Sequence, residues 1–362
     1  MRLRTLLLST LPLLAQVPAT TPDGFAVARP RYRFAFPRDH GTHPAFRTEW
    51  WYFTGHLWTA DGTRRFGYQL TFFRQASPKA AWTGSAAWRT DQIHLAHAAL
   101  TDEAGRRFRV SERLNREGIP AGAALDRLAV FNESWRAEMD ATGRIQVHFK
   151  AGDAQVALSL APATPPVVFG EDGVSRKGAD PTAASHYVTF PRLASTGTLT
   201  FGEAAPLAVS GHSWMDHEFS SNQLSEGQVG WDWAAIQFRD GRHLMAYRMR
   251  LKGGDQDPFS SVTEVDAKGR ITRSTREFSM RPKGQWTSPA SKASYPLPLE
   301  LEAWGQRWTL VPILEAQELR TARSTGITYW EGACRVVDSS GTEVGDAYVE
   351  LTGYAHSLKG RF

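Results

Sequence analysis

The sequence contains little cysteine, no long apolar run and no strong excess of one charge. Cys334 is the single cysteine among 362 residues, which excludes an intrachain disulfide framework and a zinc or iron–sulfur site built on cysteines. The 42 Lys and Arg residues nearly balance the 37 Asp and Glu residues, so the charge gives no case for a nucleic-acid partner. The apolar runs are too short for a stable membrane span.

Motifs of several common enzyme classes are also absent. No Gly-x-Ser-x-Gly elbow accompanies the Ser, His and Asp residues, which argues against a serine hydrolase. No glycine-rich phosphate-binding loop is present, and we expect no cofactor. His94 and His97 stand three residues apart and would face opposite sides of a strand, so we expect no metal site there.

The first residues have the order of a secretory signal peptide. Arg2 and Arg4 precede a short apolar run over 6–14, and small residues follow up to Ala19. We therefore expect a signal peptide over 1–19, cleaved near Ala19, and a mature protein that is periplasmic or secreted. Because no cysteine follows the apolar run, a lipoprotein anchor is not available.

Aromatic residues are abundant. The chain has 13 Trp, 19 Phe and 9 Tyr residues. So much flat, apolar surface fits either a thick β core or a cavity that receives an apolar ligand. The composition leaves both interpretations open.

The body of the chain predicts many short antiparallel strands. Residues 69–72 and 144–149 alternate with the period of two that is typical of half-buried strands. Turn sequences such as Asp240-Gly241 separate runs of this kind. One short helix is expected over 111–116. The pattern as a whole favours an all-β fold of barrels or sandwiches.

A weak internal repeat suggests two similar halves. An aromatic start followed by a turn and a strand recurs three times, at 50–73, 231–247 and 329–349. Residues 203–206 interrupt the strands between the halves. We therefore expect one domain over 24–205 and a second over 206–362.

Motifs spread over most of the chain carry a family resemblance. They are 43–57 (HPAFRTEWWYFTGHL), 66–74 (FGYQLTFFR), 94–97 (HLAH), 211–218 (GHSWMDHE), 230–233 (GWDW), 329–332 (YWEG) and 348–354 (YVELTGY). In these motifs the chain resembles the bacterial AttH/CrtC-type lipocalin-like family, which includes carotenoid 1,2-hydratases and exported proteins described as predicted secreted hydrolases. The resemblance implies two consecutive lipocalin-like antiparallel β-barrel domains, in agreement with the strand pattern.

The hydratase reaction sets chemical requirements for a site. Adding water across an isolated, electron-rich C=C bond needs no redox cofactor, but it needs a carboxylic acid that stays protonated near neutral pH. An apolar surrounding provides such an acid by raising its pKa. Aromatic faces then stabilise the carbocation, and a second polar group positions or deprotonates the attacking water.

Asp216 is the best candidate for this acid. On a strand, Trp214, Asp216 and Glu218 point to one face, and if that face is the barrel lumen, an acid lies beside an indole. The resemblance implies that Asp216 is essential, since the hydratases depend on an Asp in a comparable Asp-His motif. The hydratases have Asn directly after that motif, where this chain has Glu218. A structural carboxylate bound to a loop, an Arg or a His is the alternative.

Further candidates come from neighbouring motifs. Asp232 lies between Trp231 and Trp233, although strand alternation would point it away from both rings. His186 and Tyr187 fall where, by the resemblance, the hydratases have a functional His. For Asp232 and His186 a structural role is the competing interpretation.

The run before the first aromatic strand adds Glu49. It is either a buried acid in the first barrel or a rim residue paired with Arg47 or Arg74, and pairing is favoured because a lone buried carboxylate is costly. The sequence thus predicts Asp216, His186 and Asp232 as catalytic residues. It predicts Trp214, Tyr187, Trp231, Trp233, Trp51 and Glu49 as ligand-binding residues, with core packing as the default alternative for any single Trp.

Two classes of function follow. The first is a carotenoid 1,2-hydratase-like hydro-lyase that adds water to an alkene in an isoprenoid, polyketide or lipid-like ligand, with Asp216 as proton donor. A Diels–Alder cyclase, as in distant fungal relatives with similar architecture, and a secreted hydrolase are variants of this class. The second is a periplasmic carrier of a hydrophobic molecule, with an envelope transporter as a partner.

Overall fold

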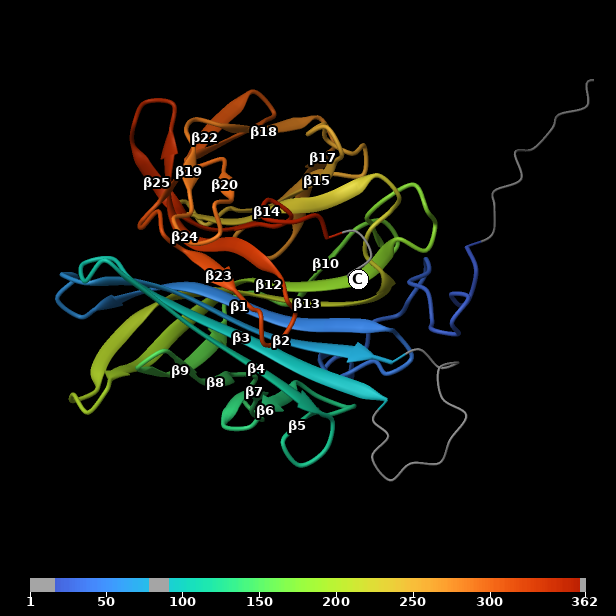
Figure 1. Cartoon of the computed structure of the whole chain (residues 1–362), viewed down its shortest axis with the longest axis horizontal. Coiled ribbons are helices and arrows are strands. Elements are labelled where there is room, and N and C mark those ends of the chain that lie inside the picture. The colour runs from blue at the N-terminus through green and yellow to red at the C-terminus, as the bar shows by residue number, and fades with distance from the viewer. Residues whose placement is uncertain (1–16, 78–90, 359–362) are drawn as a thin grey trace, which may run out of the picture.

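The computed structural model describes residues 17–77 and 91–358, which form an all-β protein of two nearly closed antiparallel barrels (Figure 1). Most of the expected signal peptide, residues 1–16, lies outside the described residues. Within the described ranges the helical structure is a single 3-10 turn, η1 (Arg38–His40). No described helix is long and apolar enough to cross a membrane.

The first barrel is a 13-stranded sheet. Its main path runs β4-β3-β2-β1-β13-β12-β9-β8-β7-β6-β5, and β10 and β11 pair with β12. These strands are β1 (Thr48–Thr59), β2 (Arg65–Ala76), β3 (Gln92–Asp102), β4 (Arg107–Arg116), β5 (Ala121–Ala123), β6 (Ala129–Asn132), β7 (Trp135–Met139), β8 (Ile145–Ala151), β9 (Ala154–Pro162), β10 (Val167–Phe169), β11 (Ser175–Arg176), β12 (Ala184–Phe201) and β13 (Leu207–Asn222).

The second barrel is a 10-stranded sheet. Its main path runs β17-β16-β15-β14-β25-β24-β22-β21-β18, and β23 pairs with β24. These strands are β14 (Gln228–Phe238), β15 (His243–Leu251), β16 (Ser261–Val265), β17 (Ile271–Thr275), β18 (Phe278–Pro282), β21 (Leu299–Ala303), β22 (Gln306–Pro312), β23 (Glu318–Arg320), β24 (Thr328–Asp338) and β25 (Glu343–Leu351). A separate pair is formed by β19 (Trp286–Thr287) and β20 (Ser294–Tyr295).

The passage from one sheet to the other differs from the expected domain boundary. The turn at 203–206 joins β12 to β13 inside one long hairpin of the first sheet. A division between 205 and 206 would therefore cut this hairpin. The change of sheet falls after Asn222 and before Gln228, because β13 completes the first barrel by pairing with β1.

The local strand predictions are confirmed except in one segment. The three aromatic-start hairpins are β1–β2, β14–β15 and β24–β25. The helix expected over 111–116 is wrong, because these residues belong to β4, which pairs with β3 along its length. The helix-forming residues in this segment lie on an edge strand, where sheet pairing outweighs local preference.

Side chains alternate between the inside of each barrel and the layer between the barrels. On β1, Trp51 and Phe53 enter the core of the first barrel, while Tyr52 packs towards the second. On β24, Trp330 enters the second core, while Ala333 packs towards the first barrel. Both barrels are filled by such side chains, so the space for a ligand has to be sought between them.

Direct contacts join the two barrels. The Arg65 guanidinium on β2 pairs with the Asp346 carboxylate on β25 at 2.5 Å, and Thr101 on β3 donates to Gln317 Oε1 at 2.7 Å. A Cβ added at Gly67 on β2 would meet the Ala333 Cβ at 2.4 Å. The barrels therefore lie face to face at close range, as Figure 1 shows for the blue strands beneath the red ones.

Candidate functional site

A pocket lies between the two barrels, with one wall from each. The first barrel contributes the outer faces of β1, β2, β12 and β13, and the second contributes β14, β15, β24 and β25. Its aromatic lining includes Trp50, Tyr187, Trp231, Trp233 and Tyr329.

The strand register builds the wall of the first barrel. Tyr52 on β1 stands opposite Asp216 on β13, and Trp50 stands opposite Glu218. Tyr187 on β12 is in turn the partner of Glu218. Because residues two apart on a strand share a face, Asp216 and Glu218 both face the pocket, each beside an aromatic residue.

The register of the second barrel aligns acids and aromatics in the same way. Glu331 on β24 stands opposite Glu350 on β25, and Glu350 stands opposite Trp233 on β14. Tyr247 on β15 continues this row. All four side chains line the pocket.

Hydrogen bonds reach both carboxyl oxygens of Asp216. Trp214 Nε1 donates to Oδ1 and the Tyr187 hydroxyl donates to Oδ2, each at 2.7 Å. Trp233 Nε1, from the second barrel, donates to the Tyr187 hydroxyl at 3.2 Å. Burial raises the Asp216 pKa to about 7, although the hydrogen bonds from Tyr187, Thr189 and Trp214 lower it. The carboxyl is therefore populated in both protonation states near neutral pH.

Glu331 and Glu350 form a second acidic centre on the opposite wall. Burial raises the Glu331 pKa well above its usual value, and the neighbouring Glu350 charge raises it further. Tyr52 and Tyr329 lie close to Glu331 and lower its pKa, which offsets part of this rise. Burial also raises the Glu350 pKa to about 7, although Trp231 Nε1 donates to Oε2 at 3.0 Å. Two adjacent buried carboxyls of this kind do not both ionise, so the pair retains a proton.

One buried cation balances the remaining acid of the pocket. Lys177 Nζ lies 2.9 Å from Glu218 Oε1, and it stands over the rings of Tyr187 and Tyr247 at 4.9 and 4.6 Å. Both partners of the ion pair are almost fully buried. The pair adds no net charge, so the pocket as a whole is an apolar space with protonatable groups.

A line of hydrogen bonds leads away from the pocket along the junction of the two barrels. The Tyr329 hydroxyl contacts His97 Nδ1 at 2.8 Å, and His97 Nε2 contacts the Ser324 hydroxyl at 2.9 Å. Ser324 then donates to Glu112, a half-exposed residue of β4. Burial lowers the His97 pKa to about 3, so the imidazole is neutral at physiological pH.

Five of the nine predicted site residues meet at this pocket. Asp216, Tyr187, Trp231 and Trp233 line it, and Trp214 lies behind Asp216 as its hydrogen-bond donor. The sequence did not say whether the Asp216 face is a barrel lumen, and in the structure it is not. Met215 and His217 point into the first barrel, which places Asp216 on its outer face.

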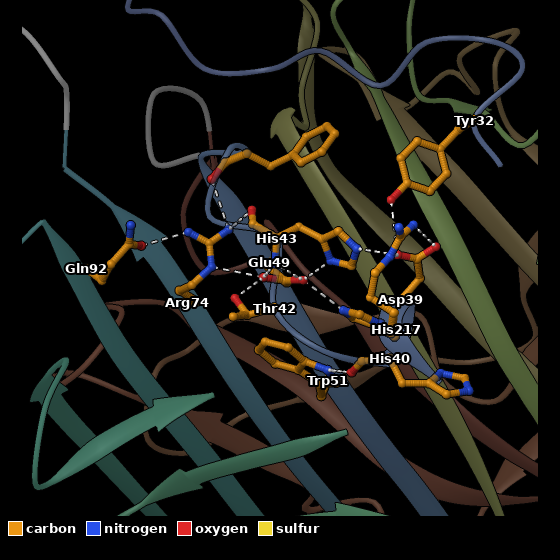
Figure 2. Close-up of polar contacts among 12 residues, drawn as sticks. Tyr32, Asp39, His40, Thr42, His43, Glu49, Trp51, Arg74, Gln92 and His217 are labelled. Carbon is orange, nitrogen blue, oxygen red and sulfur yellow. Dashed lines mark hydrogen bonds and ion pairs between the residues drawn. The ribbon is translucent and has the colours of Figure 1, made fainter. Parts of the chain in front are cut away.

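Glu49 lies elsewhere, inside the end of the first barrel (Figure 2). Its carboxylate accepts hydrogen bonds from Arg74 Nε at 2.9 Å, His217 Nε2 at 2.9 Å, His43 Nδ1 at 2.8 Å and Thr42 Oγ1 at 2.8 Å. Burial opposes ionisation, but these donors and the Arg74 charge hold the Glu49 pKa well below its usual value. The structure combines parts of both alternatives: Glu49 pairs with Arg74, but it is buried in the first barrel and does not lie at the rim. The carboxylate does not line the pocket.

Trp51 and His186 also lie outside the pocket. Trp51 points into the first barrel and donates from Nε1 to the His40 carbonyl at 3.0 Å (Figure 2). His186 bonds the Gly173 carbonyl through Nδ1 at 2.7 Å and packs on Tyr32 with ring centroids 4.3 Å apart. Strand alternation explains both positions, since Trp50 and Tyr187 are the neighbours that face the pocket.

Asp232 is buried on the other side of β14 from Trp231 and Trp233, as alternation predicted. It pairs with Arg250 Nε at 2.9 Å and Arg248 Nη1 at 3.3 Å. Burial raises its pKa, and the two arginines offset part of the shift. The carboxyl is enclosed by partners of its own barrel and does not line the pocket.

One group in the described part of the chain has the spacing of a metal site. His43, Glu49 and His217 place their ligand atoms within 4.8 Å of one another. The Glu49 oxygens already accept the donors named above, and the Arg74 guanidinium beside them repels a cation. The chemistry of the cluster therefore fits a hydrogen-bonded ionic network.

Sequence reasoning missed the two acids of the second barrel. Glu331 and Glu350 were present in the family motifs 329–332 and 348–354, but no function was attached to them. The available signal was a carboxylate on the same face as an aromatic residue: Tyr329 stands two residues before Glu331, and Tyr348 two before Glu350.

The fold and pocket define a class of two-barrel β proteins in which aromatic rings and protonatable carboxyls meet between the barrels. Residues 27–354 match the model of the AttH-like family, and the chain belongs to that family. No curated protein matches the chain.

Solved structures show the same architecture. The structure of an AttH candidate from Nitrosomonas europaea is 32% identical over 91% of this chain and 99% of its own, with a TM-score of 0.83. Kievitone hydratase from Nectria haematococca is 14% identical over 94% of this chain and 96% of its own, with a TM-score of 0.68. CghA with Sch210972 is 13% identical over 86% of this chain and 89% of its own, with a TM-score of 0.52. The last two likenesses concern the fold.

Proposed function

We propose that this protein is an exported enzyme that binds an apolar, alkene-bearing molecule between its barrels and adds water across the double bond. Asp216 is the proton donor of this proposal. The observation that carries it is a buried carboxyl with a pKa of about 7, facing a pocket lined by Trp and Tyr rings. The name of kievitone hydratase, whose fold is similar, supports hydration as the reaction class.

The steps follow from the chemistry of the walls. The Asp216 proton is transferred to one alkene carbon, and the electron pair of the double bond forms the new C–H bond. The faces of aromatic residues such as Trp231 and Trp233 stabilise the positive charge on the other carbon. Water adds to this carbon and loses a proton to a carboxylate of the pocket, and return of a proton to Asp216 completes the cycle. The product is an alcohol, and no electron acceptor is needed.

The decisive experiment begins with the natural ligand. The full chain is expressed in a bacterial host, the mature protein is extracted with organic solvent, and mass spectrometry identifies any apolar molecule that has co-purified. Turnover of that molecule to a product heavier by one water is then measured for the wild type and for Asp216→Asn. General acid catalysis contributes about 10²-fold or more, so we expect turnover to fall by at least that factor.

A matched control separates chemistry from folding. Asp240→Asn changes an exposed turn acid outside the pocket and is expected to leave turnover unchanged. Asp216→Asn is expected to keep ligand affinity within a few-fold of wild type, because the amide occupies the same space. Full turnover by Asp216→Asn would show that Asp216 is not the proton donor. Tight binding without any turnover by the wild type would favour a carrier.

A further inference from the structure

The pocket contains more hydrogen-bonding capacity than its walls satisfy. Glu331 Oε1, Tyr52 Oη and Gln223 Nε2 are buried at the pocket and make no hydrogen bond of standard geometry among the described residues, although Tyr52 lies near enough to Glu331 to lower its pKa. Their side chains belong to residues that are only 1%, 7% and 7% exposed. Buried polar groups without partners are costly, and in a ligand site they indicate where polar atoms of the ligand lie.

Two of these atoms meet at the acid pair. Glu331 and Glu350 are direct neighbours across β24 and β25, and Tyr52 approaches Glu331 from the first barrel. Because the acid pair retains a proton, it offers both a donor O–H and free acceptor oxygens. Tyr52 adds a hydroxyl that serves in either role.

This combination selects among ligand groups. A hydrocarbon would cover these atoms and leave them all unpaired. A ketone, ether or ester oxygen accepts hydrogen bonds from the protonated carboxyl or from Tyr52 but donates none, so it would leave the acceptor oxygens of the acid pair without a donor. A hydroxyl group both donates and accepts, and so matches the acid pair and Tyr52 together.

We infer that the ligand is a hydroxylated apolar molecule, a phenol or an alcohol, whose hydroxyl group binds between Glu331, Glu350 and Tyr52 while its carbon skeleton packs on Trp231 and Trp233. The inference rests on the proposed function in one respect, that the space between the barrels is the ligand site. It narrows the substrate class, since a pure hydrocarbon polyene does not meet this requirement.

The test uses three probes that share one skeleton: trans-stilbene, 4-methoxystilbene and 4-hydroxystilbene. Dissociation constants are measured for the mature wild-type protein by quenching of tryptophan fluorescence. One additional hydrogen bond to a strongly polar site corresponds to an affinity gain of about tenfold. We expect 4-hydroxystilbene to bind about tenfold more tightly than either of the other probes.

Variants assign the preference to the acid pair. Glu331→Leu is expected to abolish the preference for 4-hydroxystilbene, and Tyr52→Phe, which keeps the ring, to reduce it. Glu300→Leu on β21, outside the pocket, is the matched control and should keep it. Thermal unfolding of each variant confirms that it is folded, and Tyr52→Phe remains informative if Glu331→Leu does not fold.

The outcomes are distinguishable. Equal or tighter binding of trans-stilbene by the wild type overturns the ligand class but leaves the pocket as the ligand site. A preference that survives both Glu331→Leu and Tyr52→Phe overturns the assignment to these residues. Failure of all three probes to bind below about 100 μM overturns both the ligand class and the proposed ligand site.

Discussion

At Asp216 and Glu350, burial and indole hydrogen bonds act on a carboxyl in opposite directions. Each acid accepts a hydrogen bond from a tryptophan, Trp214 and Trp231 respectively, and such bonds favour the ionised form. Burial nevertheless prevails, and both pKa values lie at about 7. The tryptophans therefore hold the acids in place while the apolar surrounding keeps them able to give up or take a proton near neutral pH.

This arrangement makes the titration observable. Since Trp214 and Trp231 bind the titrating groups directly, we expect tryptophan emission to change with a midpoint near pH 7. Because the folded state binds the Asp216 proton more tightly than the unfolded chain, stability should fall as the pH rises from about 4, the usual Asp value, to about 7. Asp216→Asn should remove the Asp216 contribution to the change in tryptophan emission and to the pH dependence of stability. Fluorescence titration and urea unfolding at each pH would measure these two contributions. An unchanged titration in Asp216→Asn would contradict the assignment.

At the scale of the element, β1 has different roles on its two faces. Trp50 and Tyr52 face the pocket, whereas Glu49 and Trp51 face the inside of the barrel. The single strand β1 thus carries residues of the buried ionic network around Glu49 on one face and residues of the pocket wall on the other. Its period of two is what separates a structural residue from a site residue one position away.

Glu49→Gln tests this separation. The amide keeps the shape but leaves Arg74 without its buried counter-charge, and breaking a buried ion pair costs about 3 kcal/mol or more in free energy of unfolding. We expect a loss of that size in urea unfolding, while the affinity of the folded variant for a pocket probe such as 4-hydroxystilbene stays within about twofold. Glu300→Gln, on a strand away from both sites, serves as the control. If Glu49→Gln lost affinity for the probe but kept its stability, Glu49 would be a residue of the ligand site.

The elements also show what sequence predicts and what it does not. The alternation in 144–149 and the three aromatic hairpins depend on neighbours in sequence, and these strands were predicted correctly. Alternation likewise placed Asp216 and Glu218 on one face. It does not say whether that face is inside or outside a barrel, because both faces of β13 are buried, one by the core and one by the second barrel. The acid pair Glu331–Glu350 was missed since it forms only when β24 and β25 pair and meet the first barrel.

At the scale of the whole molecule, the separation of the barrels sets the width of the pocket. Gly67 and Ala333 are a point of close approach, where two small residues permit β2 and β24 to meet. A Cβ at Gly67 would lie 2.4 Å from the Ala333 Cβ, so atoms at this contact would have to shift.

Gly67→Ala is therefore expected to destabilise the protein by about 1–3 kcal/mol in urea unfolding, the usual cost of overpacking. Adding Ala333→Gly in the same chain should recover most of the loss, because it removes the opposing Cβ. Ala333→Gly alone provides the comparison for the double variant. A double variant no more stable than Gly67→Ala would show that the loss does not come from this contact.

A pocket with its two walls on different barrels has a consequence for how ligand preference changes within the family. Neither barrel alone presents a complete site, so a small rotation of one barrel against the other alters the distance between Asp216 and the acid pair without replacing either. Contacts such as Arg65–Asp346 and Gly67–Ala333, which do not line the pocket, then act as adjustment points. Relatives with identical walls are accordingly expected to differ in ligand shape wherever these adjustment points differ.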